Sequence, residues 1–158
     1  MKTSWMLIPA AAFAAMAFAS PTMAADDGAC ELTIEGNDQM QFNKDEMSVP
    51  ASCDEVTVTL EHTGEMAASA MGHNWVLAGS DEYEEIAKAG MSEGLDNDYL
   101  PQDDDRIIAH TDVIGGGEST SVTFSTEGLE DRDLTFFCSF PGHYAAMNGT
   151  FTVTKEEE

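Results

Sequence analysis

A short segment near the C-terminus concentrates three side chains that could bind a soft metal ion. Cys138, His143 and Met147 supply a thiol, an imidazole and a thioether within a few residues of one another. Thiolate and thioether sulfurs select Cu(I), and imidazole suits both oxidation states of copper. The intervening Pro141-Gly142 pair predicts a turn, which would let the flanking side chains reach one point. The segment therefore predicts a copper site.

A further ligand has to come from elsewhere in the chain, and His73 is the strongest candidate. It follows Gly72 at the start of an expected strand, where the lack of a side chain allows close backbone approach. Two histidines and a cysteine in one plane, with a long axial methionine, form the ligand set of a blue-copper electron-transfer site. Zinc is a poorer match because its sites favour further cysteine, histidine or carboxylate ligands. Any one of these residues alone is more often a packing or surface residue, and the prediction depends on their combination.

The first 24 residues have the layout of a secretory signal peptide. Lys2 gives a positive start, Trp5 to Ala19 is apolar, and Thr22-Met23-Ala24 offers small residues at the cleavage position. The apolar run is shorter than the ~18 to 20 residues that a membrane-spanning helix needs. We therefore predict export, cleavage after Ala24, and a single domain over residues 25–158.

The exported chain would carry three cysteines, which leaves one thiol unpaired. Export permits disulfides. We expect Cys30 and Cys53, which lie early in the chain in polar surroundings, to pair. Cys138, in an aromatic run, would then be free for chemistry.

The chain is strongly acidic, with 30 acidic residues against 6 basic ones and a net charge of −24. Removal of the leader would also remove Lys2, and 30 acidic against 5 basic residues would leave −25. Such a surface repels nucleic acid and anionic membranes and favours basic partners. An equally good explanation is a surface that stays soluble at high salt concentration.

Short segments of alternating apolar and polar residues predict an all-β fold. Val56, Val58 and Leu60 would face one way, and the intervening residues the other. Glycine-rich turns separate the expected strands, which are 30–35, 56–61, 73–77, 106–111, 121–125, 134–138 and 150–154. About seven or eight such strands indicate a Greek-key β-sandwich or barrel.

One segment departs from this pattern. Ser80 to Ala89 predicts a short inserted helix, with Asp81 and Glu84 as a capping box and Gly90 as the stop signal.

The segment Cys138-Ser-Phe-Pro-Gly-His-Tyr-Ala-Ala-Met147 resembles the ligand loop of the azurins, within the cupredoxin family. The spacing of cysteine, histidine and methionine is that of azurins, whereas plastocyanins and pseudoazurins have a shorter Cys–His spacing. The likeness extends over residues 25–155 and includes the stretches 36–42, 71–77, 94–100, 108–111 and 121–124.

This resemblance implies roles for residues near the copper ligands. The backbone carbonyl of Gly72 would make a weak contact with the metal. The side chain of Asn74 would tie the two ligand-bearing loops together, and the backbone amide of Phe140 would donate to the cysteine sulfur. Hydrogen bonds of this kind tune the reduction potential. The family's structural disulfide corresponds to Cys30–Cys53.

The resemblance also implies a place and a mode of electron exchange. Electrons would pass through the edge of His143, at the centre of an apolar docking patch. The patch residues are Met40, Met66, Ala70, Met71, Met91, Phe140, Pro141 and Ala146. Expected partners are redox proteins such as basic c-type cytochromes or periplasmic reductases, which a monomer would meet in transient complexes.

The sequence thus predicts a periplasmic one-electron carrier with a single type 1 copper cycling between Cu(I) and Cu(II), and not an enzyme. The alternative is a copper storage or delivery protein, which would need an exposed and open site. The aromatic residues around Cys138 favour shielding instead. A catalytic copper oxidase or reductase would need further histidine clusters, and the chain has four histidines in all. Of these, His62 and His110 are expected not to be ligands.

Overall fold

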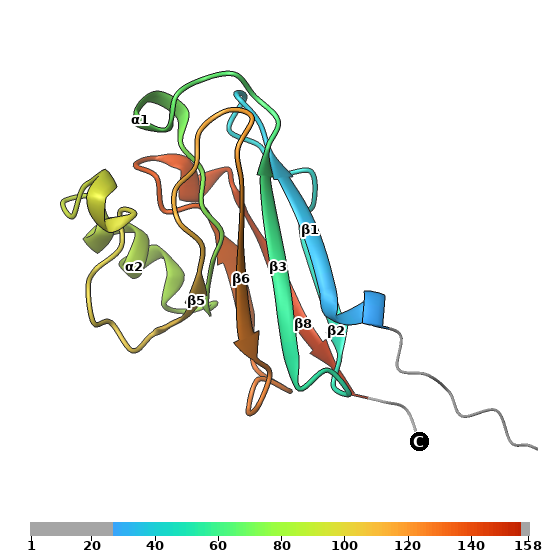
Figure 1. The fold of residues 1–158 in the computed structure, drawn as a ribbon. Helices are drawn as coiled ribbons and strands as arrows, with labels where there is room; N and C mark the ends of the chain where they lie inside the picture. Colours follow the sequence, from blue (N-terminus) through green and yellow to red (C-terminus); the bar gives the residue numbers. More distant parts are fainter. Residues whose placement is uncertain (1–26, 156–158) are drawn as a thin grey trace, which may run out of the picture.

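The computed structural model describes residues 27–155 and shows two β-sheets packed against each other (Figure 1). The smaller sheet has the strand order β1-β3-β6, and the larger one β2-β8-β7-β4-β5. The strands are β1 (Glu31–Gly36), β2 (Glu46–Pro50), β3 (Glu55–His62), β4 (Val76–Gly79), β5 (Ile107–His110), β6 (Ser119–Ser125), β7 (Leu134–Phe137) and β8 (Asn148–Thr154). The helical segments are η1 (Asp27–Cys30), α1 (Ala68–Met71), α2 (Tyr83–Gly90), η2 (Leu95–Asn97) and η3 (His143–Ala145).

The eight strands confirm the predicted all-β sandwich. Strand β1 pairs with β3 in parallel, β2 pairs with β8 in parallel, and the remaining pairs are antiparallel. Strand β2 was not expected, because its short acidic start and terminal proline hide the alternation of Met47 and Val49, which are buried. The predicted signal peptide lies outside the described residues.

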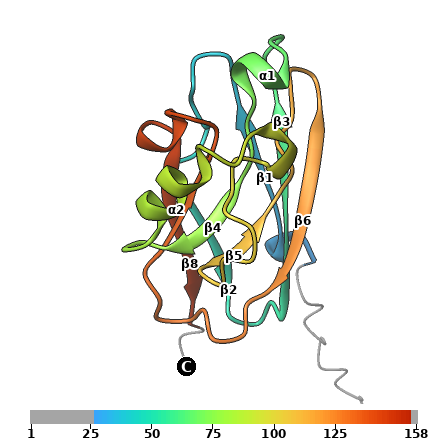
Figure 2. The same ribbon diagram turned by 90° about the vertical axis from the view of Figure 1, so that its left-hand side faces the viewer.

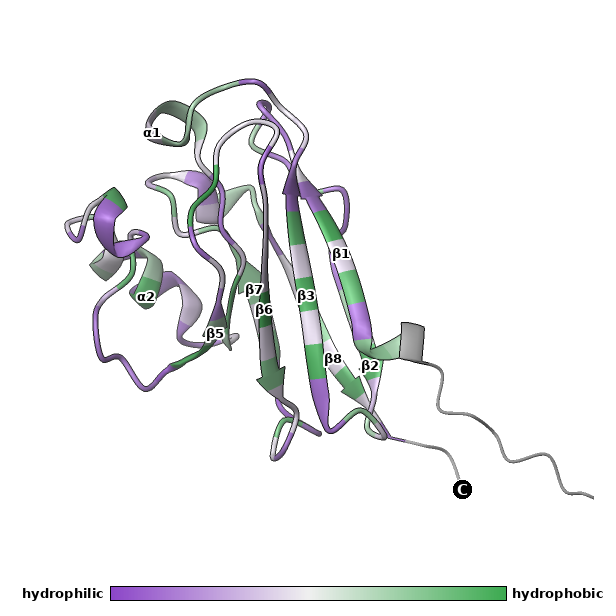
Figure 3. Ribbon diagram, viewed as in Figure 1, coloured by the Kyte–Doolittle hydropathy of each residue, from purple (hydrophilic) through white to green (hydrophobic). Residues whose placement is uncertain are grey.

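The core lies between the two sheets and follows the two-residue period of the strands. Val56, Val58 and Leu60 of β3 are buried, as the alternation predicted. They share one apolar cluster with Trp75 and with residues of β7 and β8, and Figure 3 shows the alternation along β3. A sandwich closed in this way leaves its loops to carry the functional residues.

Helix α2 covers part of the outer face of the larger sheet (Figure 2). Ile86 and Ala87 point into a second apolar cluster with Val76 of β4 and Phe137 of β7. All four residues of β4 are therefore buried. The helix begins three residues later than predicted, and the expected capping box is wrong, because no side chain caps its N-terminus.

Gly90 ends α2 for a different reason from the one predicted. It is the last helical residue rather than a stop beyond the helix. A Cβ at this position would overlap the carbonyl of Tyr99, so the glycine allows the following loop to pack onto the helix. The four-residue helix α1, which was not predicted, leads into Gly72.

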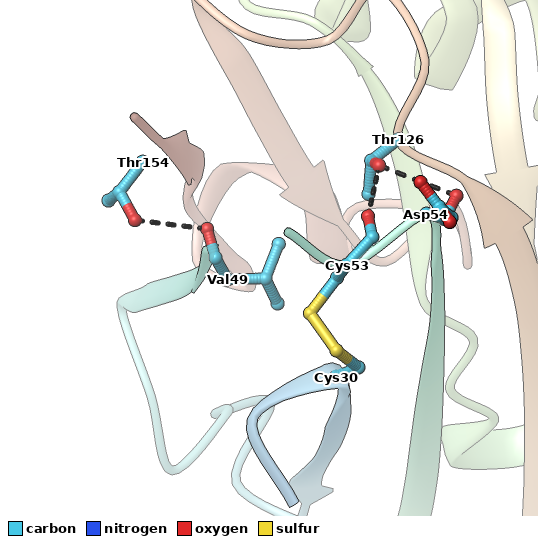
Figure 4. Close-up of a disulfide and its surroundings, with 6 residues drawn as sticks. All are labelled: Cys30, Val49, Cys53, Asp54, Thr126 and Thr154. Atoms are coloured by element: carbon cyan, nitrogen blue, oxygen red, sulfur yellow. Dashed lines mark hydrogen bonds between the residues drawn. A yellow bond between two sulfur atoms is a disulfide. The ribbon is translucent and has the colours of Figure 1, made fainter. Parts of the chain in front are cut away.

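The predicted disulfide between Cys30 and Cys53 is present, with a Cα–Cα distance of 5.7 Å. It joins η1 to the turn before β3, at the lower end of the molecule in Figure 1. Figure 4 shows that Thr126, from the turn after β6, donates its hydroxyl to the carbonyl of Cys53. No helix in residues 27–155 combines the length and the apolar character that crossing a membrane would require.

Candidate metal centre

The segment from Cys138 to Met147 is the connection between the antiparallel strands β7 and β8. Its base is closed twice: Phe137 pairs with Asn148, and the amide of Cys138 donates to the carbonyl of Met147 at 3.0 Å. Gly142 has a φ of 84°, a left-handed conformation that suits glycine, and the chain then turns into η3. The predicted turn thus brings His143 back beside Cys138.

His73 reaches the same point from the segment that leads into β4, the strand that pairs with β7 in the larger sheet. Its backbone pairs with Ile114, with N–O distances of 3.1 and 2.9 Å. A Cβ on the preceding Gly72 would overlap the carbonyl of Ala68 and lie only 2.5 Å from Cγ1 of Val113. Close backbone approach, which the sequence predicted at this glycine, is therefore confirmed.

The three predicted donors Cys138, His73 and His143 converge. The sulfur of Cys138 lies 3.9 Å from Nδ1 of His73 and 3.7 Å from Nδ1 of His143. All three donor atoms lie within 4.8 Å of one another, and all three residues are buried. Within the described part of the chain, no other group of three His, Cys, Asp or Glu residues could hold a metal ion.

Both histidines are held in the neutral form that a metal ligand requires. Burial lowers the pKa of His143 to about 4, and it is also the main cause of the lowered pKa of His73. Nε2 of His73 lies 2.7 Å from the carbonyl of Asn37. A carbonyl only accepts, so Nε2 carries the proton and Nδ1 presents its lone pair towards Cys138.

The thiol of Cys138 is protonated in the absence of a metal. Burial raises its pKa to about 12, although hydrogen bonds from the backbone amides of Asn74 and Phe140 act in the opposite direction. Since a metal binds the thiolate, metal binding must displace this proton.

Met147 and Gly72 lie beside these donors. Met147 is fully buried, yet like Cys138 it belongs to neither apolar cluster of the core. His73 and Met147 both pack against Gly36. A Cβ on this glycine would lie 2.8 Å from Cδ2 of His73 and 3.5 Å from the methyl carbon of Met147. The carbonyl of Gly72 is 4.0 Å from the sulfur of Cys138. Both predicted weak ligands are thus next to the donor group.

Asn74 joins the two ligand-bearing segments, as predicted. Its Oδ1 accepts from the amide of Ser139 at 2.8 Å, and its Nδ2 donates to the hydroxyl of Ser139 at 2.8 Å. The same Nδ2 and hydroxyl also donate to the carbonyl of Asp98. Sequence reasoning missed Ser139 and Asp98, whose part depends on backbone geometry that no motif signals.

His62 also has a place that the sequence did not reveal. It is buried and stacks on His73, with 4.4 Å between the ring centroids. Its Nδ1 accepts from the amide of Gly64 and its Nε2 lies 2.7 Å from the carbonyl of Met71, so both ring nitrogens are satisfied. His110 is exposed and is not part of the donor group.

The residues of the predicted docking patch are at least partly accessible. Met40, Met66 and Met91 are about 40% exposed and are the only large hydrophobic residues of the described segment that are so exposed. Ala70 and Ala146 are exposed, whereas Met71, Phe140 and Pro141 are half-buried. His143 itself is only 3% exposed, under the ring of Phe140 at 4.5 Å.

The donor set fits copper. One thiol and two neutral imidazoles lie beside a buried thioether, and soft sulfur ligands with imidazole select copper over hard cations. No carboxylate takes part in the donor group. This ligand group is consistent with one type 1 copper.

Comparisons with known proteins agree with this chemistry. Residues 28–154 match the model of the family described as copper binding proteins, plastocyanin/azurin family. The chain is 50% identical to the azurin of Bordetella pertussis, over 85% of this chain and 88% of that protein. It is 48% identical to the azurin of Pseudomonas aeruginosa, over 85% and 89%.

A solved structure is also similar. The azurin Az-iso2 of Methylomonas sp. strain J superposes with a TM-score of 0.76 and 47% sequence identity, covering 81% of this chain and 98% of that one. The chain therefore belongs to the plastocyanin/azurin family of copper binding proteins.

Proposed function

We propose that this protein is a periplasmic one-electron carrier. In this proposal His73, Cys138 and His143 would hold one type 1 copper, and Met147 and the backbone carbonyl of Gly72 would add weak contacts. The observation that carries the proposal is the convergence of a buried thiol and two buried Nδ1 atoms within 4.8 Å. Copper bound there would supply a reversible one-electron couple, Cu(II)/Cu(I).

The protein's part is to hold the donors in one geometry through the exchange. The doubly closed base of the loop, the pairing of His73 with Ile114 and the Asn74–Ser139 hydrogen bonds all resist movement of the ligands. Little rearrangement is then needed when the charge at the site changes. All three donor residues are buried, which suits electron exchange better than the binding of a substrate at the metal.

The same burial argues against copper storage or delivery, which calls for easy release. Cys138 is fully covered, and the amides of Asn74 and Phe140 donate to its sulfur. A metal held by this thiolate would have to leave through a packed interior.

The visible absorption spectrum of residues 25–158 tests the copper site. After loading with Cu(II), we expect an intense blue absorption that bleaches with a mild reductant and returns on oxidation. The Cys138→Ser variant should fold, bind the ion weakly and lack the blue absorption. A colourless wild-type protein that still binds copper would overturn the proposal and favour storage or delivery.

We further propose that the docking patch receives a basic redox protein, such as a c-type cytochrome or a periplasmic reductase. The exposed methionines supply an apolar centre, and the net charge of −24 supplies long-range attraction. Weak redox encounters use small surfaces of this kind.

Stopped-flow electron exchange with a basic cytochrome tests this docking. Met66→Glu should slow the exchange several-fold, because it places a charge in the apolar contact. Thr152→Glu adds the same charge on the exposed face of β8 and serves as the matched control. Equal rates for the two variants would exclude the patch as the contact surface.

A further inference from the structure

Asp98 adopts a left-handed backbone conformation, with φ of 53° and ψ of 25°, and Tyr99 follows with φ of 50°. Two successive residues other than glycine in this region are unusual, because the side chain of an L-residue disfavours the conformation. The strain is maintained by local hydrogen bonds: the amide of Asp98 donates to Leu95, and that of Tyr99 to Gly94, both at 3.0 Å. The loop after α2 is thereby turned so that the carbonyl of Asp98 faces the ligand-bearing segments.

This carbonyl oxygen accepts two hydrogen bonds. The hydroxyl of Ser139 donates at 2.7 Å, and Nδ2 of Asn74 at 3.2 Å. Ser139 follows Cys138 in the chain, and Asn74 follows His73. One backbone oxygen therefore connects the segments that carry the thiol and the first imidazole.

The side chain of Asp98 reaches a third segment. Its Oδ1 accepts from the amide of Val113 at 2.7 Å. Val113 lies against Gly72, where a Cβ would be 2.5 Å from its Cγ1. The carboxylate of Asp98 therefore holds a residue that packs against Gly72, and the carbonyl of Gly72 is 4.0 Å from the sulfur of Cys138.

We propose that Asp98 is a positioning residue that sets the distance of the Gly72 carbonyl from the metal, through its hydrogen bond to Val113. The inference rests on the proposed copper site. A carbonyl oxygen close to the site favours the more positive Cu(II) state, and axial contacts and hydrogen bonding tune the potential of such sites. Loss of the bond to Val113 should let this carbonyl recede, and the reduction potential should rise.

Two substitutions separate this hydrogen bond from the charge and from the backbone strain. Asp98→Asn removes the charge but keeps an acceptor for the amide of Val113, and asparagine tolerates the left-handed conformation. Asp98→Gly removes the acceptor as well, while glycine adopts the same conformation without strain. The difference between the two variants therefore reports on the hydrogen bond.

The reduction potential of both variants is the first readout. We expect a small rise for Asp98→Asn, and a clearly larger rise together with a shifted thiolate-to-copper absorption for Asp98→Gly. Equal potentials in the two variants would overturn the proposal. If Asp98→Gly does not fold, Val113→Ala keeps the amide but removes the side chain behind Gly72, and its potential should also rise; an unchanged potential would overturn the proposal.

Hydrogen exchange of the Val113 amide in the zinc-loaded protein is the second readout. Exchange should be slow in the wild type and in Asp98→Asn, and at least tenfold faster in Asp98→Gly. Unchanged protection in Asp98→Gly would overturn the proposal. A wild-type protein that is not blue would instead count against the proposed function, so the two failures are distinguishable.

Discussion

At the scale of single residues, burial and hydrogen bonding decide which form each donor takes. Cys138 and His143 are both covered by protein, and burial moves the pKa of the thiol up and that of the imidazole down. Each shift favours the uncharged form, so the metal-free site carries no charge of its own near neutral pH. A metal ion would bring the charge that the thiolate then balances.

The lowered pKa of His143 predicts a pH dependence of stability in the metal-free protein. The unfolded chain takes up the proton near pH 6.5, whereas the folded protein resists it until about pH 4. This contribution to the free energy of unfolding is therefore complete above pH 6.5. It is lost as the pH falls towards 4, by up to about 3 kcal/mol.

Urea unfolding at several pH values measures this effect. Carboxylates titrate in the same range, so the wild type has to be compared with His143→Asn, in which this background is retained. As the pH falls from 6.5 to 4, the free energy of unfolding of the wild type should decrease more than that of His143→Asn. A difference that is independent of pH would contradict the assignment.

The sequence reveals the metal donors of the site but not the residues that connect the donor-bearing segments. Cys138, His143 and Met147 lie within one stretch of ten residues, and such a spacing of donor types can be recognised in the sequence. Ser139 and Asp98 were missed because they act through a hydroxyl and a backbone carbonyl, whose partners are distant in sequence. Their role follows from the left-handed turn at Asp98, and no residue type there demands such a turn.

At the scale of secondary-structure elements, α2 is where prediction and structure differ most. The helix itself was predicted from the sequence, but its ends depend on tertiary contacts. Glu82 precedes the helix without a side-chain cap, and Gly90 is needed for the approach of Tyr99. Strands were easier to predict, because the alternation along β3 and β8 follows directly from the burial of one face.

Substitution of Gly90 by alanine tests this contact. In an exposed helix the change would stabilise by about 1 kcal/mol. Here the new methyl group would overlap the carbonyl of Tyr99, so we expect a loss of about 1 to 3 kcal/mol in the free energy of unfolding. Urea denaturation measures the sign, and a more stable Gly90→Ala protein would show that the loop moves aside freely.

We expect the disulfide to stabilise the fold without affecting the metal site. The sequence separation of Cys30 and Cys53 is 23 residues, for which cross-linking theory gives about 3 kcal/mol. The free energy of unfolding of the double variant Cys30→Ser/Cys53→Ser, measured by urea denaturation, should be lower by that amount. Its visible spectrum and reduction potential should stay unchanged, because the bridge lies at the opposite end of the sandwich (Figure 1). A shifted potential would reveal coupling between the two ends.

At the scale of the whole molecule, the main feature is the excess of acidic over basic side chains, 30 against 6. In the described part of the chain the ion pairs involve three cations, Lys88, Arg106 and Lys155. Most acidic side chains in residues 27–155 therefore have no ion-pair partner. One direct conflict is visible in the register of β1 and β3, where Glu35 lies opposite Glu61.

This repulsion predicts that salt stabilises the protein. Raising NaCl from 10 mM to 1 M should increase the melting temperature by several degrees, because the screening length falls from about 30 Å to about 3 Å. Glu61→Gln should raise the melting temperature at low salt and have less effect at high salt. A melting temperature that falls steadily with NaCl would indicate that self-repulsion is unimportant.

The arrangement of the two ends of the sandwich has a practical consequence. Both η1 and the end of β8 lie at the disulfide end, whereas the loops that carry Cys138 and His73 lie at the other (Figures 1 and 2). A tether attached to either end of the folded segment would leave the metal-bearing face pointing away from the support. The fold is thus suited to oriented immobilisation on an electrode, or to fusion with another domain, without obstruction of electron exchange.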